Sequence, residues 1–246
     1  MLGDQLVATG KSWKSYHQSL PTTGADGVNY SDGFYTTDTN FEKMHPGMKP
    51  ELSQGDVQFL YAVKHNPFAY FRSVQEGKNP QNSLKNMVGF DGMNGLFADL
   101  QSGTVPHFSL IVPNQCNDHH GLNNAGPMCA TPQTGQLGTL ENVNPALMYR
   151  GDVTVNSIVT AIQQSKIWKN GRNAIILVWD EDHYTMAPDT NRVACIIDTS
   201  YGKHGIQSAQ FYTHYSLLKT LEAGFGLPCL NHACDKNAVV MSDLFS

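Results

Sequence analysis

The stretch from Asn173 to His183, NAIILVWDEDH, constrains the fold more than any other part of this chain. Six apolar residues, Ala174 to Trp179, lead directly into three consecutive acids, Asp180–Asp182. A short, unbroken apolar run rich in β-branched residues is typical of a strand that is buried on both faces, as in a parallel sheet. Because ligands of open α/β sheets bind beyond the carboxyl ends of such strands, the acids mark a candidate site.

Three neighbouring carboxylates repel one another unless a cation or basic groups lie among them. Carboxylate oxygens suit Mg²⁺, Ca²⁺ or Mn²⁺, and they also serve Zn²⁺ or iron. The alternative is that these acids cap the next helix or face solvent.

Strand-like and helix-like segments alternate along the chain. The pattern predicts strands at 12–20, 107–113, 174–179 and 193–198, and helices at 2–10, 93–101, 151–168 and 214–227. This alternation favours an α/β fold with a mainly parallel central sheet and helices on both faces, in a single domain over 1–246. Residues 22–54 are rich in Gly, Asp, Thr and Asn, and we expect a long loop or insertion there.

Composition and missing motifs exclude several classes of protein. The net charge is −5 and no Lys/Arg run occurs, which argues against a nucleic-acid partner. No apolar run approaches the roughly 20 residues that span a bilayer. The absence of GxSxG, GxxxxGK[ST], GxGxxG and HExxH removes most α/β-hydrolases, P-loop NTPases, dinucleotide-binding dehydrogenases and zincins.

The five cysteines suggest two small disulfide loops and one unpaired thiol at Cys195, inside the apolar run VACII. An alternative is that the last pair joins His232 in a metal cluster, although three such close ligands rarely complete a zinc site. Disulfides indicate a secreted or periplasmic protein. The predicted pairs are Cys116 with Cys129 and Cys229 with Cys234.

A second polar cluster, NDHHG, follows the predicted strand at 107–113 and includes Asp118, His119 and His120. An imidazole can ligate a metal, donate to a phosphate oxygen or protonate a leaving group. The alternative is a solvated loop with structural hydrogen bonds.

Three further basic positions are candidates for binding an anion. Lys64 and His65 precede Pro67, Lys203 and His204 lie between glycines, and His214 opens the last predicted helix. Backbone N–H groups at a helix start favour anions, so His214 is expected to be neutral there. Each position could instead be an ordinary turn, loop or cap.

Five blocks, in this order, resemble the phosphoesterase family that contains bacterial acid phosphatases and phospholipases C, within the alkaline phosphatase superfamily. The blocks are spread over nearly the whole chain and read SWKSYHQSLP, VKHNPF, FSLIVPNQCNDHHG, NGRNAIILVWDED and HYSLLKTLEAGFGLPCL. The resemblance implies an alkaline-phosphatase-like sheet and a divalent metal ion held by Asp180 and Glu181. It also matches Asn117, Asp118 and His120 to the family's loop, with Gly121 where relatives are often acidic, so both His119 and His120 stay candidates.

The resemblance further implies a segment before the first block, which holds a strand, a Glu-Asn pair and the Ser or Thr nucleophile. This chain begins only about ten residues before that block, so we expect an N-terminally truncated domain. The expected activity is metal-dependent hydrolysis of a small phosphate monoester. The alternatives are a phospholipase C-type phosphodiesterase, or an inactive fragment that binds a metal or anion. The implied residues are His119, His120 and Asp118 as catalytic groups, and Lys64, His65, His204 and His214 as substrate-binding groups.

Overall fold

A computed structural model describes residues 1–26, 60–122, 129, 145–182 and 191–245. These residues form two compact units, 1–162 and 163–246, and each is described by itself. The single-domain organisation stays a prediction. Most of the loop or insertion predicted at 22–54 lies outside the described residues.

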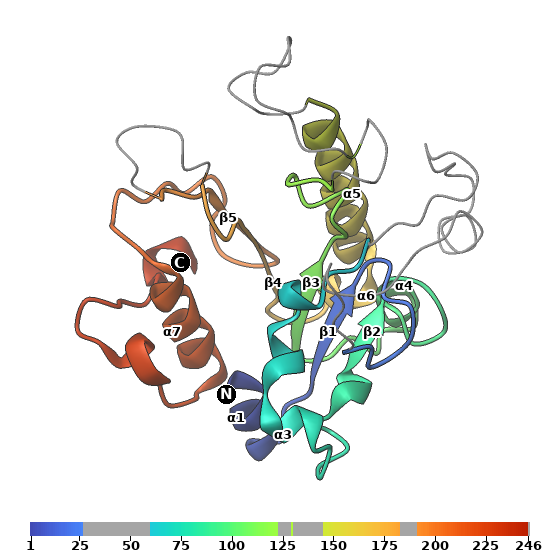
Figure 1. Cartoon of the computed structure of the whole chain (residues 1–246). Helices are drawn as coiled ribbons and strands as arrows, with labels where there is room; N and C mark the ends of the chain where they lie inside the picture. The colour runs from blue at the N-terminus through green and yellow to red at the C-terminus, as the bar shows by residue number, and fades with distance from the viewer. Residues whose placement is uncertain (27–59, 123–128, 130–144, 183–190, 246) are drawn as a thin grey trace. The chain divides into compact units, whose positions relative to one another are not determined.

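A three-stranded parallel sheet forms the centre of the first unit (Figure 1). It consists of β1 (Trp13–His17), β2 (Met87–Gly89) and β3 (Phe108–Val112), in the order β2-β1-β3. His17 lies opposite both Gly89 and Val112, so all three strands end at one edge. The sequence predicted a parallel sheet, and this part of the prediction is confirmed.

Both faces of the central strand β1 are covered, because its side chains alternate between them. Tyr16 packs on one face with residues of α4 (Leu96–Ser102) and α5 (Pro145–Gln164), in a cluster that includes Phe90. Trp13 stacks on Phe68 on the other face, with 4.2 Å between ring centroids. The remaining elements of this unit are α1 (Leu2–Ala8), η1 (Val63–His65), η2 (Pro67–Tyr70), α3 (Arg72–Gln75) and η3 (Leu84–Asn86).

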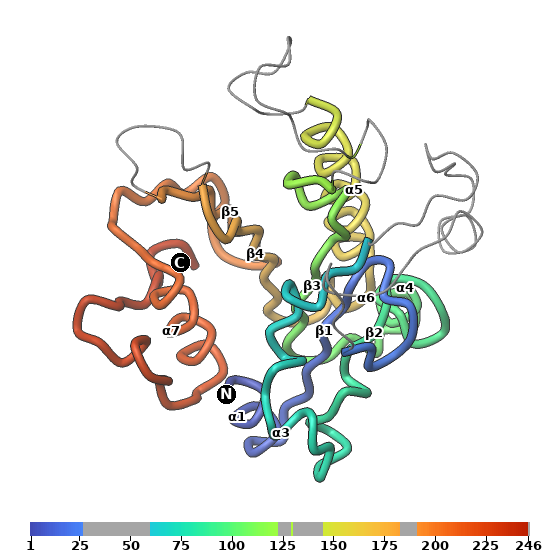
Figure 2. Tube along the Cα trace, in the orientation of Figure 1, coloured from blue at the N-terminus to red at the C-terminus, as the bar shows by residue number. Residues whose placement is uncertain are grey.

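The second unit contains an antiparallel strand pair and a capped helix. Strands β4 (Ala174–Val178) and β5 (Cys195–Thr199) run side by side in Figure 2. Helix α7 (His214–Phe225) begins where the Thr213 side chain accepts a hydrogen bond from the Ser216 N–H, and it ends at Gly226 with φ of 68°. These are the cap residues that the sequence pattern favours. The shorter elements are α6 (Lys166–Lys169), η4 (Asn231–Cys234) and η5 (Ser242–Phe245).

The expected environment of β4 is wrong. The apolar run predicted a strand in a parallel sheet, buried on both faces, but β4 pairs antiparallel with β5. Ala174 is exposed and the rest of β4 is only half-buried. An apolar run indicates that a strand buries its side chains. Which strand pairs with it, and whether the two run parallel or antiparallel, depends on segments far away in the sequence. The larger alkaline-phosphatase-like sheet stays a prediction. In the part of the chain that the structure describes, no helix is both long and apolar enough to cross a membrane.

Candidate functional site

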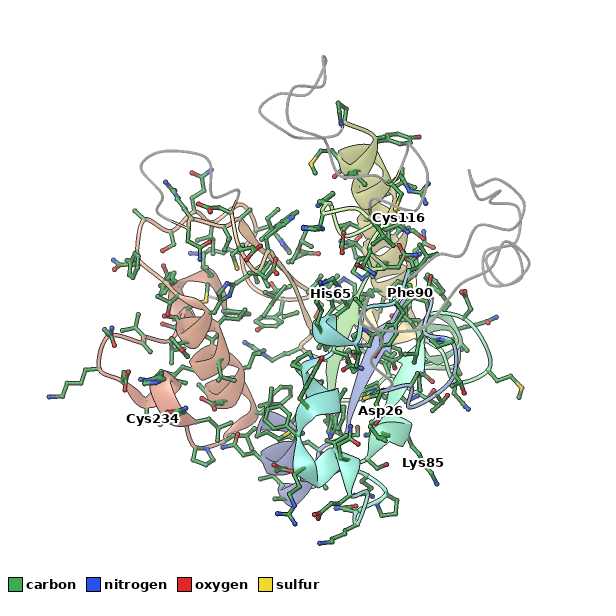
Figure 3. The ribbon with its side chains drawn as sticks, in the orientation of Figure 1. Asp26, His65, Lys85, Phe90, Cys116 and Cys234 are labelled. Atoms are coloured by element: carbon green, nitrogen blue, oxygen red, sulfur yellow. A yellow bond between two sulfur atoms is a disulfide. The ribbon has the colours of Figure 1, made fainter. Side chains whose placement is uncertain are left out.

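The polar loop after β3 lies at the edge where the parallel strands end. Its Gln115 N–H donates to the Leu60 carbonyl at 3.0 Å, which joins the loop to the segment leading into η1. That short helix carries Lys64, which is exposed, and His65, which is half-buried (Figure 3). The loop and η1 therefore bring two predicted parts of the site together at the carboxyl edge of the sheet.

Asp118 faces His65, with 3.9 Å between its Oδ2 and the Nδ1 of His65. Its other oxygen, Oδ1, accepts hydrogen bonds from the N–H groups of His120 at 2.9 Å and Gly121 at 3.3 Å. Burial raises the pKa of the Asp118 carboxyl, although those N–H groups and the charge of His65 act in the opposite direction. The backbone of the turn thus binds Oδ1 of Asp118, and Oδ2 faces the His65 ring.

The two adjacent histidines of the loop do not share an environment. His119 adopts a φ of 73°, uncommon for a residue with a side chain, and its ring lies against Gly151 of α5. A Cβ atom at Gly151 would lie 2.0 Å from the Cδ2 and Nε2 of that ring. The His120 side chain is exposed, with its Nδ1 3.0 Å from the Gly121 carbonyl oxygen.

His17, at the carboxyl end of β1, is a buried histidine that the sequence did not single out. Its side chain is 1% exposed, and its Nε2 lies 2.7 Å from the Ser15 Oγ. Burial lowers the pKa of His17 to about 3, and the positive charge of His65 lowers it further, whereas the Asn66 side chain acts in the opposite direction. The alternation of β1 carried the signal, since it places His17 on the same face as the buried Trp13.

Arg150 of α5 also joins this edge, and the sequence offered no local signal for it. Its Nε donates to the Asn117 Oδ1 at 3.1 Å, and the Asn117 Nδ2 donates to the Gln18 Oε1 at 3.0 Å. The same Gln18 oxygen accepts from the Asn114 N–H at 3.1 Å. This network ties the ends of β1 and β3 to α5 and adds a cation beside the loop.

Both predicted disulfides are present, Cys116–Cys129 and Cys229–Cys234, and Cys195 is free and exposed. The alternative metal cluster at the second pair is therefore wrong. The nearby His232 instead places its Nδ1 3.0 Å from the Asp235 carboxylate.

The predicted metal ligands lie in the second unit, just after β4. Asp180 and Glu181 are exposed, and the His214 Nε2 donates to the Asp180 carbonyl oxygen at 2.9 Å. His204 lies elsewhere in this unit, with its Nδ1 3.6 Å from the Asp198 Oδ1. His214 thus contacts the backbone of Asp180, whereas His204 faces the Asp198 carboxylate.

The carboxylate oxygens after β4 are of the chemical type that binds a hard divalent cation. Adjacent carboxylates provide the oxygen ligands that Mg²⁺, Ca²⁺ and Mn²⁺ accept. Among the described residues, no group of three or more His, Cys, Asp or Glu side chains is placed to hold a metal ion. His183, which follows these acids, lies outside the described residues. Metal binding by Asp180 and Glu181 therefore stays a prediction.

Comparison with known proteins shows similarity to fungal acid phosphatases. The chain is 24% identical to the acid phosphatase of Aspergillus fumigatus over 231 residues, which are 93% of this chain and 40% of that protein. It is 24% identical to the phosphate-repressible acid phosphatase of Penicillium chrysogenum, covering 94% of this chain and 43% of that protein. For the probable acid phosphatase of Kluyveromyces lactis the values are 23%, 96% and 44%.

The identity to each of these proteins is low. The chain spans less than half the length of the curated relatives it matches. No protein-family model matches it, and no solved structure does.

Proposed function

We propose that this chain is part of an acid-phosphatase-like phosphomonoesterase, to which it contributes an imidazole–carboxylate site. The observation that carries the proposal is the pairing of His65 with Asp118 at the carboxyl edge of the parallel sheet. Ligands of α/β proteins bind at such edges. The similarity to proteins named acid phosphatase supports a phosphate ester as the ligand.

In this proposal His65 donates a hydrogen bond or a proton to the substrate. A carboxylate at 3.9 Å favours the charged imidazole, which can bind a phosphoryl oxygen or protonate a leaving group. Lys64, exposed next to it, adds positive charge for an anionic ester. His119 and His120 are further donors from the Asp118 loop.

Asp180 and Glu181 would hold a divalent metal ion, and His214 positions their backbone through the Asp180 carbonyl. Such an ion, when bound, stabilises negative charge on phosphoryl oxygens. His204, beside Asp198, is proposed to bind substrate. The two disulfides support an oxidising compartment, so we propose that the protein is secreted or periplasmic.

The test is hydrolysis of p-nitrophenyl phosphate by this chain from pH 5 to 9, with Mg²⁺, Mn²⁺, Ca²⁺, Zn²⁺ or Fe²⁺ added. We expect His65→Gln to lower kcat/KM by about 10²–10⁴-fold, the usual contribution of general acid–base catalysis. Asp180→Ala should abolish the metal-dependent activity. Bis-p-nitrophenyl phosphate, a diester, tests the phospholipase C-type alternative in parallel.

His107→Gln is the matched control, because His107 precedes β3 at the opposite end of the same sheet. Its Nδ1 accepts a hydrogen bond from the Ser12 N–H at 3.2 Å, away from the candidate site. Its activity should stay within about twofold of the parent chain. Equal activity of His65→Gln and His107→Gln would reject the assigned site.

A second candidate function is anion binding without turnover, favoured by the exposed cation Lys64 next to His65 on η1. Titration with inorganic phosphate, followed by calorimetry, distinguishes it. Phosphate binding that His65→Gln removes, without hydrolysis under any condition, would support this candidate over the phosphatase.

A further inference from the structure

Four polar side chains lie completely inside the first unit, behind His65. Ser15 and Asn66 are 0% exposed, His17 is 1% exposed and Tyr61 is 2% exposed. Ser15 and His17 come from β1, while Tyr61 and Asn66 flank η1, the short helix that carries His65. A buried polar group that lacks a hydrogen bond destabilises the fold, so the side chains of this cluster are held where each finds a partner.

The hydrogen bonds of this cluster run in one direction. The Tyr61 hydroxyl donates to the Ala25 carbonyl at 3.0 Å, and it accepts from the Asn66 Nδ2 at 3.3 Å. The Asn66 Oδ1 accepts from the Ser15 hydroxyl at 3.3 Å. Ser15 has a single hydroxyl proton, so toward the His17 Nε2, 2.7 Å away, its oxygen acts as the acceptor. His17 therefore carries a proton on Nε2.

The cluster controls the position of His65 through the backbone. Asn66 follows His65 directly, and its own N–H donates to the Val63 carbonyl at 2.8 Å, which closes η1. The Asn66 Oδ1 accepts a hydrogen bond from Ser15 of β1, and the Asn66 Nδ2 donates one to the Tyr61 hydroxyl. The T-shaped contact between the rings of His17 and Tyr61, with centroids 5.6 Å apart, closes the cluster on itself.

The two histidines differ in burial. His17 is buried, whereas the His65 side chain is 30% exposed and faces the Asp118 carboxylate. Burial disfavours the charged form of His17, and the charge of nearby His65 disfavours it further.

We propose that Asn66 is a positioning residue for His65, held by the chain His17–Ser15–Asn66–Tyr61, with His17 as its neutral, proton-fixed end. The hydrogen-bond chain orients the η1 backbone so that the His65 ring faces Asp118. The catalytic meaning of this arrangement rests on the proposed phosphatase function, but the arrangement itself does not.

The first measurement is long-range ¹H–¹⁵N NMR of the imidazole rings in the full chain between pH 4 and 8. We expect His17 to keep the Nε2–H form throughout this range. A His17 ring that titrates in this range, or that carries its proton on Nδ1, would overturn the proposal.

Ser15→Ala removes the hydroxyl that contacts both His17 and Asn66, and Ser109→Ala is the matched control on the neighbouring strand. Among the described residues, the buried Ser109 Oγ has no hydrogen-bond partner, so its removal breaks no chain. We expect Ser15→Ala to shift the ring resonances of His65, because the Asn66 side chain loses its contact with β1. Ser109→Ala should leave them unchanged, and equal His65 resonances in both variants would refute the positioning role.

Tyr61→Phe tests the other end of the chain if Ser15→Ala does not fold, because the ring that contacts His17 is kept while the hydroxyl that Asn66 reaches is lost. It should shift the His65 resonances in the same way, and an unchanged His65 would likewise overturn the proposal.

Turnover separates this proposal from the proposed function. If the chain hydrolyses p-nitrophenyl phosphate, Ser15→Ala should lower kcat about tenfold with KM nearly unchanged and move the acidic limb of the pH profile, as expected for a misplaced catalytic group. The NMR result with no hydrolysis and no phosphate binding would retain the positioning role and reject the phosphatase.

Discussion

Strands β1 and β4 are both followed by polar residues, yet the environments at their ends differ. His17 ends β1 inside the first unit, where Ser15, Asn66 and Tyr61 surround it with hydrogen bonds. Beyond β4, Asp180 and Glu181 face solvent, and the contact from His214 reaches a backbone carbonyl. A buried network determines its own geometry because every broken hydrogen bond is costly. Exposed carboxylates are hydrated, so a bound cation would be needed to organise them.

The largest expected effect tests this difference in burial through packing. Trp13 is 1% exposed, stacks on Phe68 and donates from its indole nitrogen to the Asn82 Oδ1 at 3.0 Å, whereas Ile196 of β5 is 56% exposed. We expect Trp13→Ala to cost about 3–5 kcal/mol of unfolding free energy. Ile196→Ala should change it by less than about 0.5 kcal/mol.

Urea denaturation followed by circular dichroism measures both variants, and native-state hydrogen exchange in β1 and β5 shows which unit is affected. A loss below about 1 kcal/mol for Trp13→Ala would mean that the first unit tolerates a cavity, contrary to close packing. A comparable loss for Ile196→Ala would mean that β5 is covered in solution.

Two helical glycines give effects of opposite sign in the two units. A Cβ at Gly151 would overlap the His119 ring, so Gly151→Ala should destabilise the chain by about 1–3 kcal/mol and displace that ring. Gly224 of α7 has open space where a Cβ would lie, so Gly224→Ala should stabilise by about 0.5–1 kcal/mol. Thermal unfolding gives the signs, and ring resonances of His119 report the displacement. If Gly151→Ala also stabilised the chain, the His119 ring would not lie against α5 as assigned.

A smaller effect concerns pH. Glu222 of α7 is 1% exposed, and burial raises its pKa above the ordinary 4.5. Because the folded pKa exceeds the unfolded one, its stabilising contribution is complete at low pH and is lost as pH rises through the folded pKa. Glu222→Gln should therefore match the parent chain near pH 4 and exceed its stability by about 1 kcal/mol at pH 8, because the amide carries no charge for burial to disfavour.

Glu76, in the first unit, provides the opposite case. Hydrogen bonds from Lys78 and Arg72 lower the pKa of its carboxyl. The contribution of Glu76 is present above the unfolded pKa and is lost as pH falls through the folded one. Glu76→Gln should thus be less stable than the parent chain at pH 8 and should approach it at acidic pH. Thermal melts across this pH range compare the two variants, and parallel pH curves would contradict the assigned burial of Glu222.

Local rules predicted most elements and several site residues. The helix at 214–227 was recognisable because Thr213 caps its start and Gly226 ends it, and both signals act within one turn. The strand at 107–113 likewise appears as Phe108–Val112. The cysteine spacing predicted both disulfides, since short loops favour pairing of their ends.

Residues held by distant partners were not predictable in the same way. His17 and Ser15 meet Asn66, which is 51 positions from Ser15 along the chain, and Arg150 meets Asn117 across 33 positions. Each partner is unremarkable in its own segment, and no periodicity or cap connects them. The pairing of His65 with Asp118 was also beyond the sequence, although each residue was a candidate alone.

The sequence by itself determined where apolar strands and helices form, which cysteines pair and which polar loops follow the strands, because those features depend on neighbouring residues. Only the tertiary structure decided that β1 becomes a central, buried strand while β4 pairs antiparallel with one exposed end. It also decided that His17 is neutral and His65 faces a carboxylate, because burial and hydrogen-bond partners are set by segments that meet only when the chain folds.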